Sequence, residues 1–147
     1  MSKRLVCFNV NGIRARIAQL KYVLEKHKPD IIGLQETKVD DGSFPTDEIT
    51  ELGYHASFFG QKGHYGVALL SKKEPLEVRK GFPNDFKDAQ RRLIYGKYSY
   101  NEGNLHVLNG YFPQGENRYH PEKFPAKRRF YQDLSSYLNT RFTPSDV

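Results

Sequence analysis

The sequence contains a single cysteine, Cys7, and no tryptophan. One cysteine excludes a disulfide framework within the chain and a zinc site built from several cysteines. No apolar run approaches the roughly 20 residues that a helix needs to span a bilayer, and the apolar stretch of MSKRLVCFNV is too short for a signal peptide. We therefore expect a cytoplasmic protein with no membrane partner.

Motifs that mark several enzyme classes are also missing. The chain has no nucleophile elbow, no G-x-x-x-x-G-K-[ST] phosphate loop and no H-E-x-x-H zinc motif. Its histidines do not follow a metal-binding spacing, so surface or core positions explain them better; they are His27, His55, His64, His106 and His120.

Basic residues outnumber acidic ones by 23 to 17, which gives a net charge of +6. This balance suits a polyanionic partner such as nucleic acid, although many basic proteins bind none. The excess is concentrated in residues 118–130, where Glu122 is the one acidic residue among Arg118, Lys123, Lys127, Arg128 and Arg129. The simplest explanation of that segment is a solvated helix face.

The first third of the chain has a strand–helix–strand pattern. Apolar residues 4–8 are followed by a turn at Asn11-Gly12, a helical pattern over 13–27 and a second apolar run over 31–35. This order predicts a parallel strand pair covered by a helix that ends before Pro29. Because the apolar residues of the first run are consecutive, both of its faces are expected to be covered.

The rest of the chain reads as a short helix, a series of strands and a final helix. In the short helix, Thr46 is the expected N-cap, and the helix is expected to end at Gly53. The loop 60–66 contains Lys62 and His64, and it either contacts phosphate or only connects the strands of a hairpin. Strands are predicted at 54–60, 67–72, 75–82, 92–100 and 104–112, and a helix over 123–142. The apolar side of that helix is expected to contain Phe124, Phe130, Tyr131, Leu134, Tyr137 and Leu138.

Polar residues follow three of the apolar strands. They are Asn9, Glu36, and the run Asn109-Gly110-Tyr111. If these strands are neighbours, Asn9, Glu36 and Tyr111 converge at the carboxyl edge of the sheet, where α/β proteins bind ligands. Oxygen ligands there would suit Mg²⁺. Each residue also has an explanation without function: Asn9 as a turn former, Glu36 as a solvated carboxylate and Tyr111 as a packed ring.

Six segments together resemble the N-terminal half of the bacterial exodeoxyribonuclease III family, in the exonuclease–endonuclease–phosphatase superfamily. They run in the family's order and spacing over all 147 residues: FNVNGIRAR, PDIIGLQETKV, LGYHASFFGQKGHYGVALLSK, DAQRRLIYGKY, LNGYFPQGENRYHPEKFPAK and FYQDLSSYL. The resemblance implies the N-terminal half of a DNase I-like four-layer α/β sandwich, a mixed β-sheet flanked by helices. Residues 1–147 would form one partial domain.

The resemblance also implies an activity, a metal and a partner. It implies a base excision repair nuclease that uses Mg²⁺, with Mn²⁺ as a substitute, to nick double-stranded DNA 5′ to abasic sites and to remove nucleotides from 3′ ends, acting as a monomer. Glu36 would bind the metal, Asn9 would help to order the metal and the catalytic carboxylates with Asn11 beside them, and Tyr111 would meet the scissile phosphate. The residues implied to face DNA are Arg92, Gln114, Lys123, Lys38, Gly63 and His64.

Two motifs of the family are missing from the sequence. They are a Gly-Asp-x-Asn motif and a Ser-Asp-His motif, and Ser145-Asp146-Val147 resembles the second only superficially. Residues 143–147 read as the approach to a further strand, so we expect a truncated, catalytically deficient chain. The alternatives are a non-catalytic DNA-binding fragment, a half that assembles with a complementing half, or the same fold acting on another phosphodiester. The match of GQKGHYGVALL and GYFPQG argues against the last.

Overall fold

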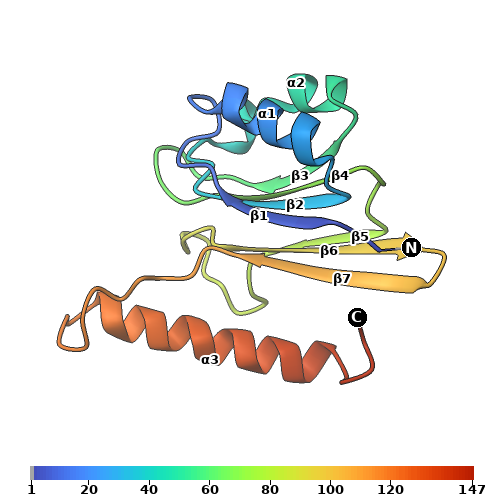
Figure 1. Cartoon of the computed structure of the whole chain (residues 1–147). Coiled ribbons are helices and arrows are strands. Elements are labelled where there is room, and N and C mark those ends of the chain that lie inside the picture. The colour runs from blue at the N-terminus through green and yellow to red at the C-terminus, as the bar shows by residue number, and fades with distance from the viewer. Residues whose placement is uncertain (1) are drawn as a thin grey trace.

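The computed structural model describes residues 2–147, which fold into four layers in the order helix, sheet, sheet, helix (Figure 1). The two sheets lie face to face in the middle of the molecule. The elements in chain order are β1 (Leu5–Asn9), α1 (Ile17–His27), β2 (Ile31–Gln35), the short 3₁₀-helix η1 (Asp41–Ser43), α2 (Thr46–Glu51), β3 (His55–Phe59), β4 (Val67–Ser71), β5 (Glu77–Lys80), β6 (Leu93–Tyr100), β7 (Gly103–Gly110) and α3 (Lys123–Arg141).

The first sheet is four-stranded and mixed, with the order β1-β2-β4-β3. Its strands β1 and β2 are parallel and in register from Leu5 opposite Ile31 to Asn9 opposite Gln35, which confirms the predicted strand–helix–strand unit. Strand β4 runs antiparallel to β2, so Val67 at its start lies opposite Gln35. The carboxyl ends of β1 and β2 therefore lie side by side at one end of the strands, next to the start of β4.

The second sheet is antiparallel, with the order β5-β6-β7. Leu93 at the start of β6 is paired with Gly110 at the end of β7. Apolar side chains from both sheets fill the space between them, among them Leu69 from β4 and Ile94 and Tyr98 from β6. The mixed α/β sandwich predicted from the sequence is therefore confirmed.

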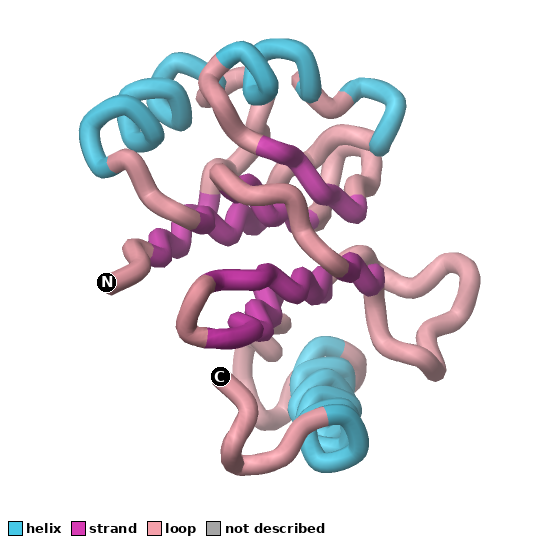
Figure 2. The backbone as a smooth tube through the Cα atoms, turned by 90° about the vertical axis from the view of Figure 1, so that its right-hand side faces the viewer, coloured by secondary structure: helices cyan, strands magenta, loops and turns pink. Residues whose placement is uncertain are grey.

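Helices cover the outer faces of both sheets, as the view along the layers shows (Figure 2). Leu20 and Leu24 of α1 and Ile49 of α2 pack on the first sheet, whereas Phe130 and Tyr137 of α3 pack under the second. No helix within residues 2–147 has the length and apolar character needed to cross a membrane.

Strand β1 departs from the prediction that both of its faces are covered. Val6 and Phe8 pack under the helices, but Leu5 is 49% exposed and Cys7 is exposed. Within the described chain, β1 is one of the two edge strands of the first sheet and pairs only with β2. A continuous apolar run was therefore a poor guide here, because burial depends on which strands and layers lie next to it.

The helices also differ from the predictions in detail. Helix α1 begins at Ile17, four residues after the buried Ile13, and ends at His27. The next residue, Lys28, has a left-handed backbone, and its N–H donates to the carbonyl of Leu24. Thr46 is not an N-cap: Pro45 precedes α2, and the Thr46 N–H donates to the carbonyl of Phe44. This compact turn already satisfies the Thr46 N–H before the helix starts.

Helix α3 has a narrower buried face than the sequence predicted. Phe130 and Tyr137 are buried, whereas Tyr131 is 48% exposed and Leu138 is 41% exposed. The second sheet reaches only one stripe of the helix, since Phe130, Leu134 and Tyr137 are its members in the cluster with Phe82.

Candidate active site at the strand ends

Asn9 and Glu36 meet because two parallel strands end side by side. Asn9 is the last residue of β1, and Glu36 follows the last residue of β2. The side-chain amide of Asn9 donates to Oε1 of Glu36 over 2.8 Å. Lys38 approaches the other carboxylate oxygen at 3.2 Å, and its ammonium group also donates to Oδ1 of Asn11 over 2.6 Å. The carboxylate is thus held on both sides.

The backbone around these residues is strained. Six non-glycine residues of the described chain have positive φ, and four of them lie here: Asn11, Glu36, Lys38 and Tyr65, with φ between 43° and 58°. Such conformations cost about 1–3 kcal/mol each and persist only where neighbours enforce them. Backbone hydrogen bonds do so: Gly12 donates to Glu36, and Lys38 donates to Tyr65. Strain gathered at one edge of a fold indicates a functional site.

Tyr111 completes the group from the second sheet. It follows β7, its N–H donates to the carbonyl of Arg92 over 2.7 Å, and its hydroxyl is close enough to the carboxylate of Glu36 for each group to shift the pKa of the other. Asn9, Glu36 and Tyr111 therefore converge, as the strand-end argument predicted.

Arg92 and Tyr65 pack against Tyr111. The guanidinium group of Arg92 lies 4.6 Å from the ring centre of Tyr65 and 4.8 Å from that of Tyr111. It also donates to the carbonyl of Tyr111 and to the side chain of Gln90. Tyr65 was not among the residues predicted from the sequence, where its only signal was an aromatic residue inside a glycine-rich loop.

The charges of the site follow from these contacts. The hydrogen bond from Asn9 is the main cause that lowers the pKa of Glu36, and Tyr111 and Lys38 add to it against the opposing effect of burial. Burial, followed by the interaction with Glu36, raises the pKa of Tyr111. At neutral pH the site therefore presents a carboxylate at Glu36 and a protonated phenol at Tyr111, with Lys38 and Arg92 beside them.

The donor set fits a hard divalent cation in part. Mg²⁺ is commonly held by one or two carboxylates, with water and substrate phosphate completing its shell, and Glu36 supplies one carboxylate. The ammonium group of Lys38 lies 3.2 Å from that carboxylate. The Oδ1 atom of Asn9 accepts the N–H of Asn11 at 3.1 Å, so Asn9 orients Glu36 through its amide nitrogen. Residues 2–147 contain no cluster of three or more His, Cys, Asp or Glu side chains that could hold a metal.

The remaining residues implied to face DNA fall into two groups. Gly63 and His64 are next to the centre: the Gly63 N–H donates to the carbonyl of Lys38 over 2.9 Å, and the His64 ring lies 5.9 Å from that of Tyr65. Gln114 and Lys123 lie beyond Tyr111, on the connection from β7 to α3 and at the start of α3.

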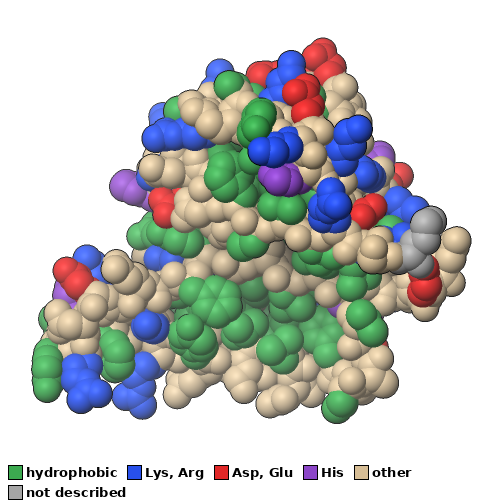
Figure 3. All heavy atoms as spheres, in the orientation of Figure 1, with side chains coloured by type: hydrophobic (Ala, Val, Ile, Leu, Met, Phe, Trp, Pro, Cys, Tyr) green, Lys and Arg blue, Asp and Glu red, His purple; other side chains and the backbone are tan. Residues whose placement is uncertain are grey.

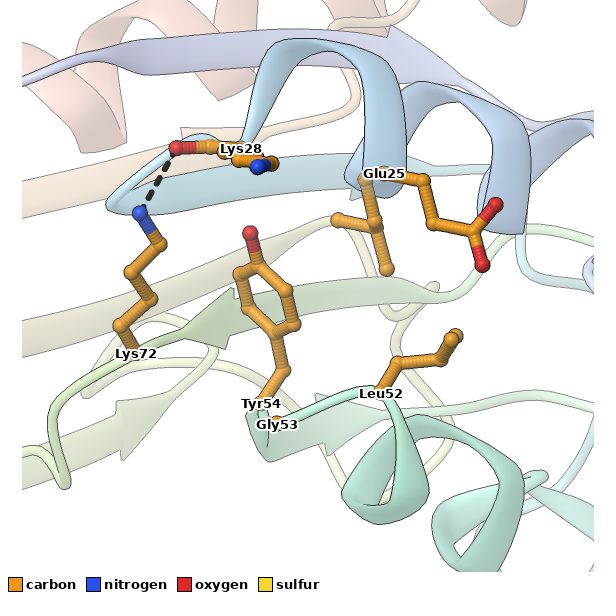
Figure 4. Close-up of a pocket in the computed structure, with 7 residues that line it drawn as sticks. Glu25, Lys28, Leu52, Gly53, Tyr54 and Lys72 are labelled. Atoms are coloured by element: carbon orange, nitrogen blue, oxygen red, sulfur yellow. Dashed lines mark hydrogen bonds between the residues drawn. The ribbon is translucent and has the colours of Figure 1, made fainter.

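A separate hollow of about 340 Å³ lies at the opposite end of the same strands (Figure 4). Its polar groups are occupied within the chain, because the Tyr54 hydroxyl donates to the carbonyl of Pro29 and Lys72 donates to that of Lys28. Leu24, Glu25, Leu52 and Gly53 complete its lining. The hollow contributes nothing to the strand-end site.

Residues 6–146 match the Endonuclease/Exonuclease/phosphatase family. The chain belongs to this family. It is 53% identical over 143 residues to exodeoxyribonuclease III of Haemophilus influenzae, an alignment that covers 97% of this chain and 54% of that relative. The predicted family resemblance is thereby confirmed.

Solved structures of this family share the fold. An AP endonuclease from Archaeoglobus fulgidus superposes with a TM-score of 0.87 at 37% identity, over 97% of this chain and 53% of that one. A 3′ phosphatase from Neisseria bound to a product DNA hairpin superposes with a TM-score of 0.85 at 33% identity, over 95% and 54%. The chain spans about half the length of the curated relatives it matches in bacteria.

Replacing Asn9 with alanine is expected to raise the pKa of Glu36, because the hydrogen bond that most favours its carboxylate is removed. A lowered carboxyl pKa stabilises the fold above the pKa of the unfolded chain, and this contribution disappears as the pH falls through the folded pKa. The stability difference between wild type and variant should therefore shrink on acidification. Urea denaturation from pH 7 down to pH 3 measures it, and Asn139→Ala on the exposed side of α3 is the control. A difference in unfolding free energy between wild type and Asn9→Ala that did not change with pH would contradict the assigned role of Asn9.

Proposed function

We propose that this chain forms the metal- and DNA-facing part of an exodeoxyribonuclease III-type repair nuclease. The activity would be hydrolysis of DNA 5′ to abasic sites and from 3′ ends, in the cytoplasm, by a monomer acting on double-stranded DNA. The observation that carries the proposal is the Glu36 carboxylate, fixed by Asn9 and Lys38 at the strand ends beside Tyr111. The relative named exodeoxyribonuclease III supports the same assignment.

Glu36 would hold Mg²⁺, or Mn²⁺ in its place, while Asn9 keeps the carboxylate ionised and oriented. The bound cation would supply positive charge against the phosphate. Tyr111, whose raised pKa keeps its hydroxyl protonated, would donate a hydrogen bond to a phosphate oxygen. Arg92 fixes the Tyr111 ring and adds positive charge at the same place. Such donors, aligned before reaction, stabilise charge that develops on phosphate.

DNA would lie across the site between two groups of contacts. Lys38, Gly63 and His64 would face it from the side of the first sheet, and Gln114 and Lys123 from the start of α3. The Neisseria 3′ phosphatase, whose structure contains a product DNA hairpin, supports a DNA ligand for this fold.

We further propose that the 147-residue chain alone has little activity. General-base catalysis needs a group whose pKa lies near the working pH. The pKa of Glu36 is lowered and that of Tyr111 is raised, so both shifts move away from neutrality. The chain would then bind DNA without efficient turnover.

A second candidate function is that of a half that assembles with a complementing segment. Strand β1 favours it, because Leu5 is 49% exposed on an edge strand that pairs only with β2 within the described residues. Unpaired strand edges with exposed apolar side chains are surfaces on which another strand can add. A further polypeptide that restores activity on mixing would support this candidate.

The test combines binding and cleavage of a labelled duplex with one abasic site, with Mg²⁺ or EDTA. Wild type should bind the duplex more tightly with Mg²⁺, and Glu36→Gln should remove that gain because it removes the carboxylate charge. Nicking by wild type should not exceed nicking by Glu36→Gln purified identically, which controls for contaminating nuclease. Absence of DNA binding would refute the proposed function, whereas strong Glu36-dependent nicking would refute only the proposed deficiency.

A further inference from the structure

The hollow of about 340 Å³ at the far end of the strands has the features of a binding site of its own. Lys28 precedes β2 and Lys72 follows β4, and the antiparallel pairing of these strands places both lysines at the end opposite Glu36. Ligand pockets typically have volumes of about 300–1,000 Å³ and a mostly apolar lining with a few polar groups. The size and position of this space, which we call the far-end hollow, therefore suit a ligand distinct from the one at the strand-end site.

The floor of the far-end hollow is apolar. Leu24 is 2% exposed and Tyr54 is 6% exposed, and Leu52 packs against the same core but is only half-buried. The Tyr54 hydroxyl donates to the carbonyl of Pro29 over 2.8 Å, so the ring presents apolar surface to the hollow. Figure 4 shows this ring between the two lysines on one side and Leu52 and Glu25 on the other. One apolar side chain of a ligand has room here.

The rim of the far-end hollow carries two ammonium groups. Lys28 and Lys72 are both exposed, and Lys72 donates to the carbonyl of Lys28 over 2.8 Å. A carbonyl oxygen is uncharged, so this bond positions the ammonium group without neutralising it. Within residues 2–147, neither lysine forms an ion pair. The acidic residue of the lining, Glu25, is paired with Lys21 at 3.9 Å, and its carboxylate points away from both rim lysines (Figure 4).

Basic side chains continue beyond Lys28. A second hollow of about 510 Å³ adjoins it and is lined by Lys3 and Arg4 together with Asp30, which accepts the backbone N–H of Arg4 over 2.8 Å. Lys and Arg side chains gather in the upper right of Figure 3, over the end of α1 and the start of β1. The Arg4 guanidinium group also donates to the carbonyl of His27 at the end of α1, where an unpaired carbonyl would repel an anion. This surface therefore suits a ligand with several negative charges.

We propose that the far-end hollow is a docking site for an acidic segment of a partner protein. One apolar side chain of that segment packs on Leu52 and Tyr54, and its carboxylates lie at Lys28 and Lys72. An apolar anchor surrounded by a polar rim is the usual form of such contacts. Nucleic acid fits less well, because its phosphates would meet the lysines but leave the apolar floor unfilled. A partner docked here leaves the strand-end site free, so the docking site and the proposed function stand independently.

The test measures peptide binding by fluorescence anisotropy at about 0.15 M salt, where charges more than about 8 Å apart are largely screened. The probe is a short fluorescein-labelled peptide with leucine and phenylalanine at its centre and aspartate and glutamate on both sides. One comparison peptide has serine in place of the two apolar residues, and another has asparagine and glutamine in place of the acids. Wild type should bind the probe at least about tenfold more tightly than either, because only the probe both fills the floor and meets the rim.

Charge reversal of the two lysines tests the rim. Lys28→Glu combined with Lys72→Glu should weaken binding of the probe about 10- to 100-fold, because two attractions become repulsions. The matched control, Lys80→Glu combined with Lys87→Glu, makes the same change in net charge at exposed positions at the end of β5 and between β5 and β6, and it should retain the wild-type affinity. Equal losses in the two double variants would show attraction by net charge alone and overturn the proposal.

Replacing Leu52 tests the floor. Leu52→Ser should weaken binding of the probe roughly fivefold and leave binding of the serine peptide unchanged, whereas Leu52→Met, which keeps the apolar surface, should bind like wild type. A cooperative thermal transition shows that each variant is folded. Equal binding of the probe and the serine peptide, or no binding by wild type up to about 1 mM probe, would overturn the proposal.

An unlabelled blunt DNA duplex separates the two sites. It should not displace the probe from wild type, because the far-end hollow and the strand-end site lie at opposite ends of the strands. Displacement would place the probe at the strand-end site and overturn the proposal. Failure of wild type to bind DNA would refute the proposed function but leave the peptide results intact.

Discussion

Replacing Gly66 with alanine is expected to lower the free energy of unfolding by about 2–5 kcal/mol, a large part of the roughly 5–15 kcal/mol that stabilises a domain. Gly66 has φ of +89°, and an added Cβ would overlap Oγ1 of Thr37. The left-handed backbone costs about 1–2 kcal/mol for a residue with a side chain, and overpacking adds about 1–3 kcal/mol. Thr37 cannot move aside easily, because it is fully buried and its N–H donates to Gly66.

Urea denaturation of Gly66→Ala and Gly63→Ala separates the two contributions. Gly63 lies in the same loop with φ of +77°, but an added Cβ would have no atom within 4 Å, so its cost should be the backbone strain alone, about 1–2 kcal/mol. Adding Thr37→Ala removes the overlapping Oγ1, and the Gly66→Ala cost in that background should fall toward the Gly63→Ala value. Equal losses at the two glycines would show that the contact with Thr37 is unimportant.

The close packing of Gly66 matters for function because Thr37 follows Glu36 directly. Glu36 and Lys38 are both held in left-handed conformations, and the backbone bonds from Thr37 to Gly66 and from Lys38 to Tyr65 enforce them. A displacement at Gly66 should therefore move the carboxylate. The loop 60–66 therefore lies next to the site and also holds the backbone that carries Glu36 and Lys38.

Much of the fold could be predicted from local patterns. The parallel pair β1 and β2 followed from two apolar runs separated by a helical pattern, and the position of Glu36 followed from its place at a strand end. Such patterns record which residues face a core. They do not record which strands lie at an edge, and this is why the exposure of Leu5 was missed.

The residues around Tyr111 were harder to predict, since their roles depend on contacts between distant segments. The prediction that Arg92 faces DNA stays a prediction, and the structure adds that its guanidinium group contacts the rings of both Tyr65 and Tyr111. No sequence pattern predicted a site role for Tyr65. Its place in the site depends on a left-handed backbone and on contacts with Arg92 and Tyr111, which flank strands of the second sheet. Sequence periodicity carries no information of that kind.

Replacing Asn109 with aspartate is expected to lower the free energy of unfolding by about 3–5 kcal/mol at pH 7, since a buried polar contact is exchanged for an uncompensated charge. Asn109 is 6% exposed. Its side-chain nitrogen donates to the carbonyls of Leu34 and Ala68, each over 2.8 Å, and its oxygen accepts a hydrogen bond from Gln35 over 2.6 Å. Aspartate has the same shape, but its ionised form would turn an acceptor toward two carbonyl oxygens.

The loss should depend on pH with a definite sign. Burial and the two carbonyls would raise the pKa of an aspartate at position 109 above the roughly 3.9 of the unfolded chain. A carboxyl group with a raised pKa in the folded state reduces stability as the pH rises from its unfolded pKa through its folded pKa. Below the unfolded pKa this loss is absent. Urea denaturation at pH 4 and at pH 7 should therefore show the larger deficit at pH 7. Asn104→Asp, exposed on the same strand, should change stability by less than about 0.5 kcal/mol.

Asn109 joins the two halves of the candidate site, which gives this variant its functional consequence. It lies on β7, two residues before Tyr111, and its contacts on β2 lie next to Glu36. Gly33 makes room for it, since a Cβ there would lie 3.0 Å from the Asn109 side chain. Disturbing this amide should separate Glu36 from Tyr111 and weaken Mg²⁺-dependent DNA binding along with stability. If Asn109→Asp instead retained stability within about 1 kcal/mol at pH 7, the sheets would be held together by their apolar interface alone.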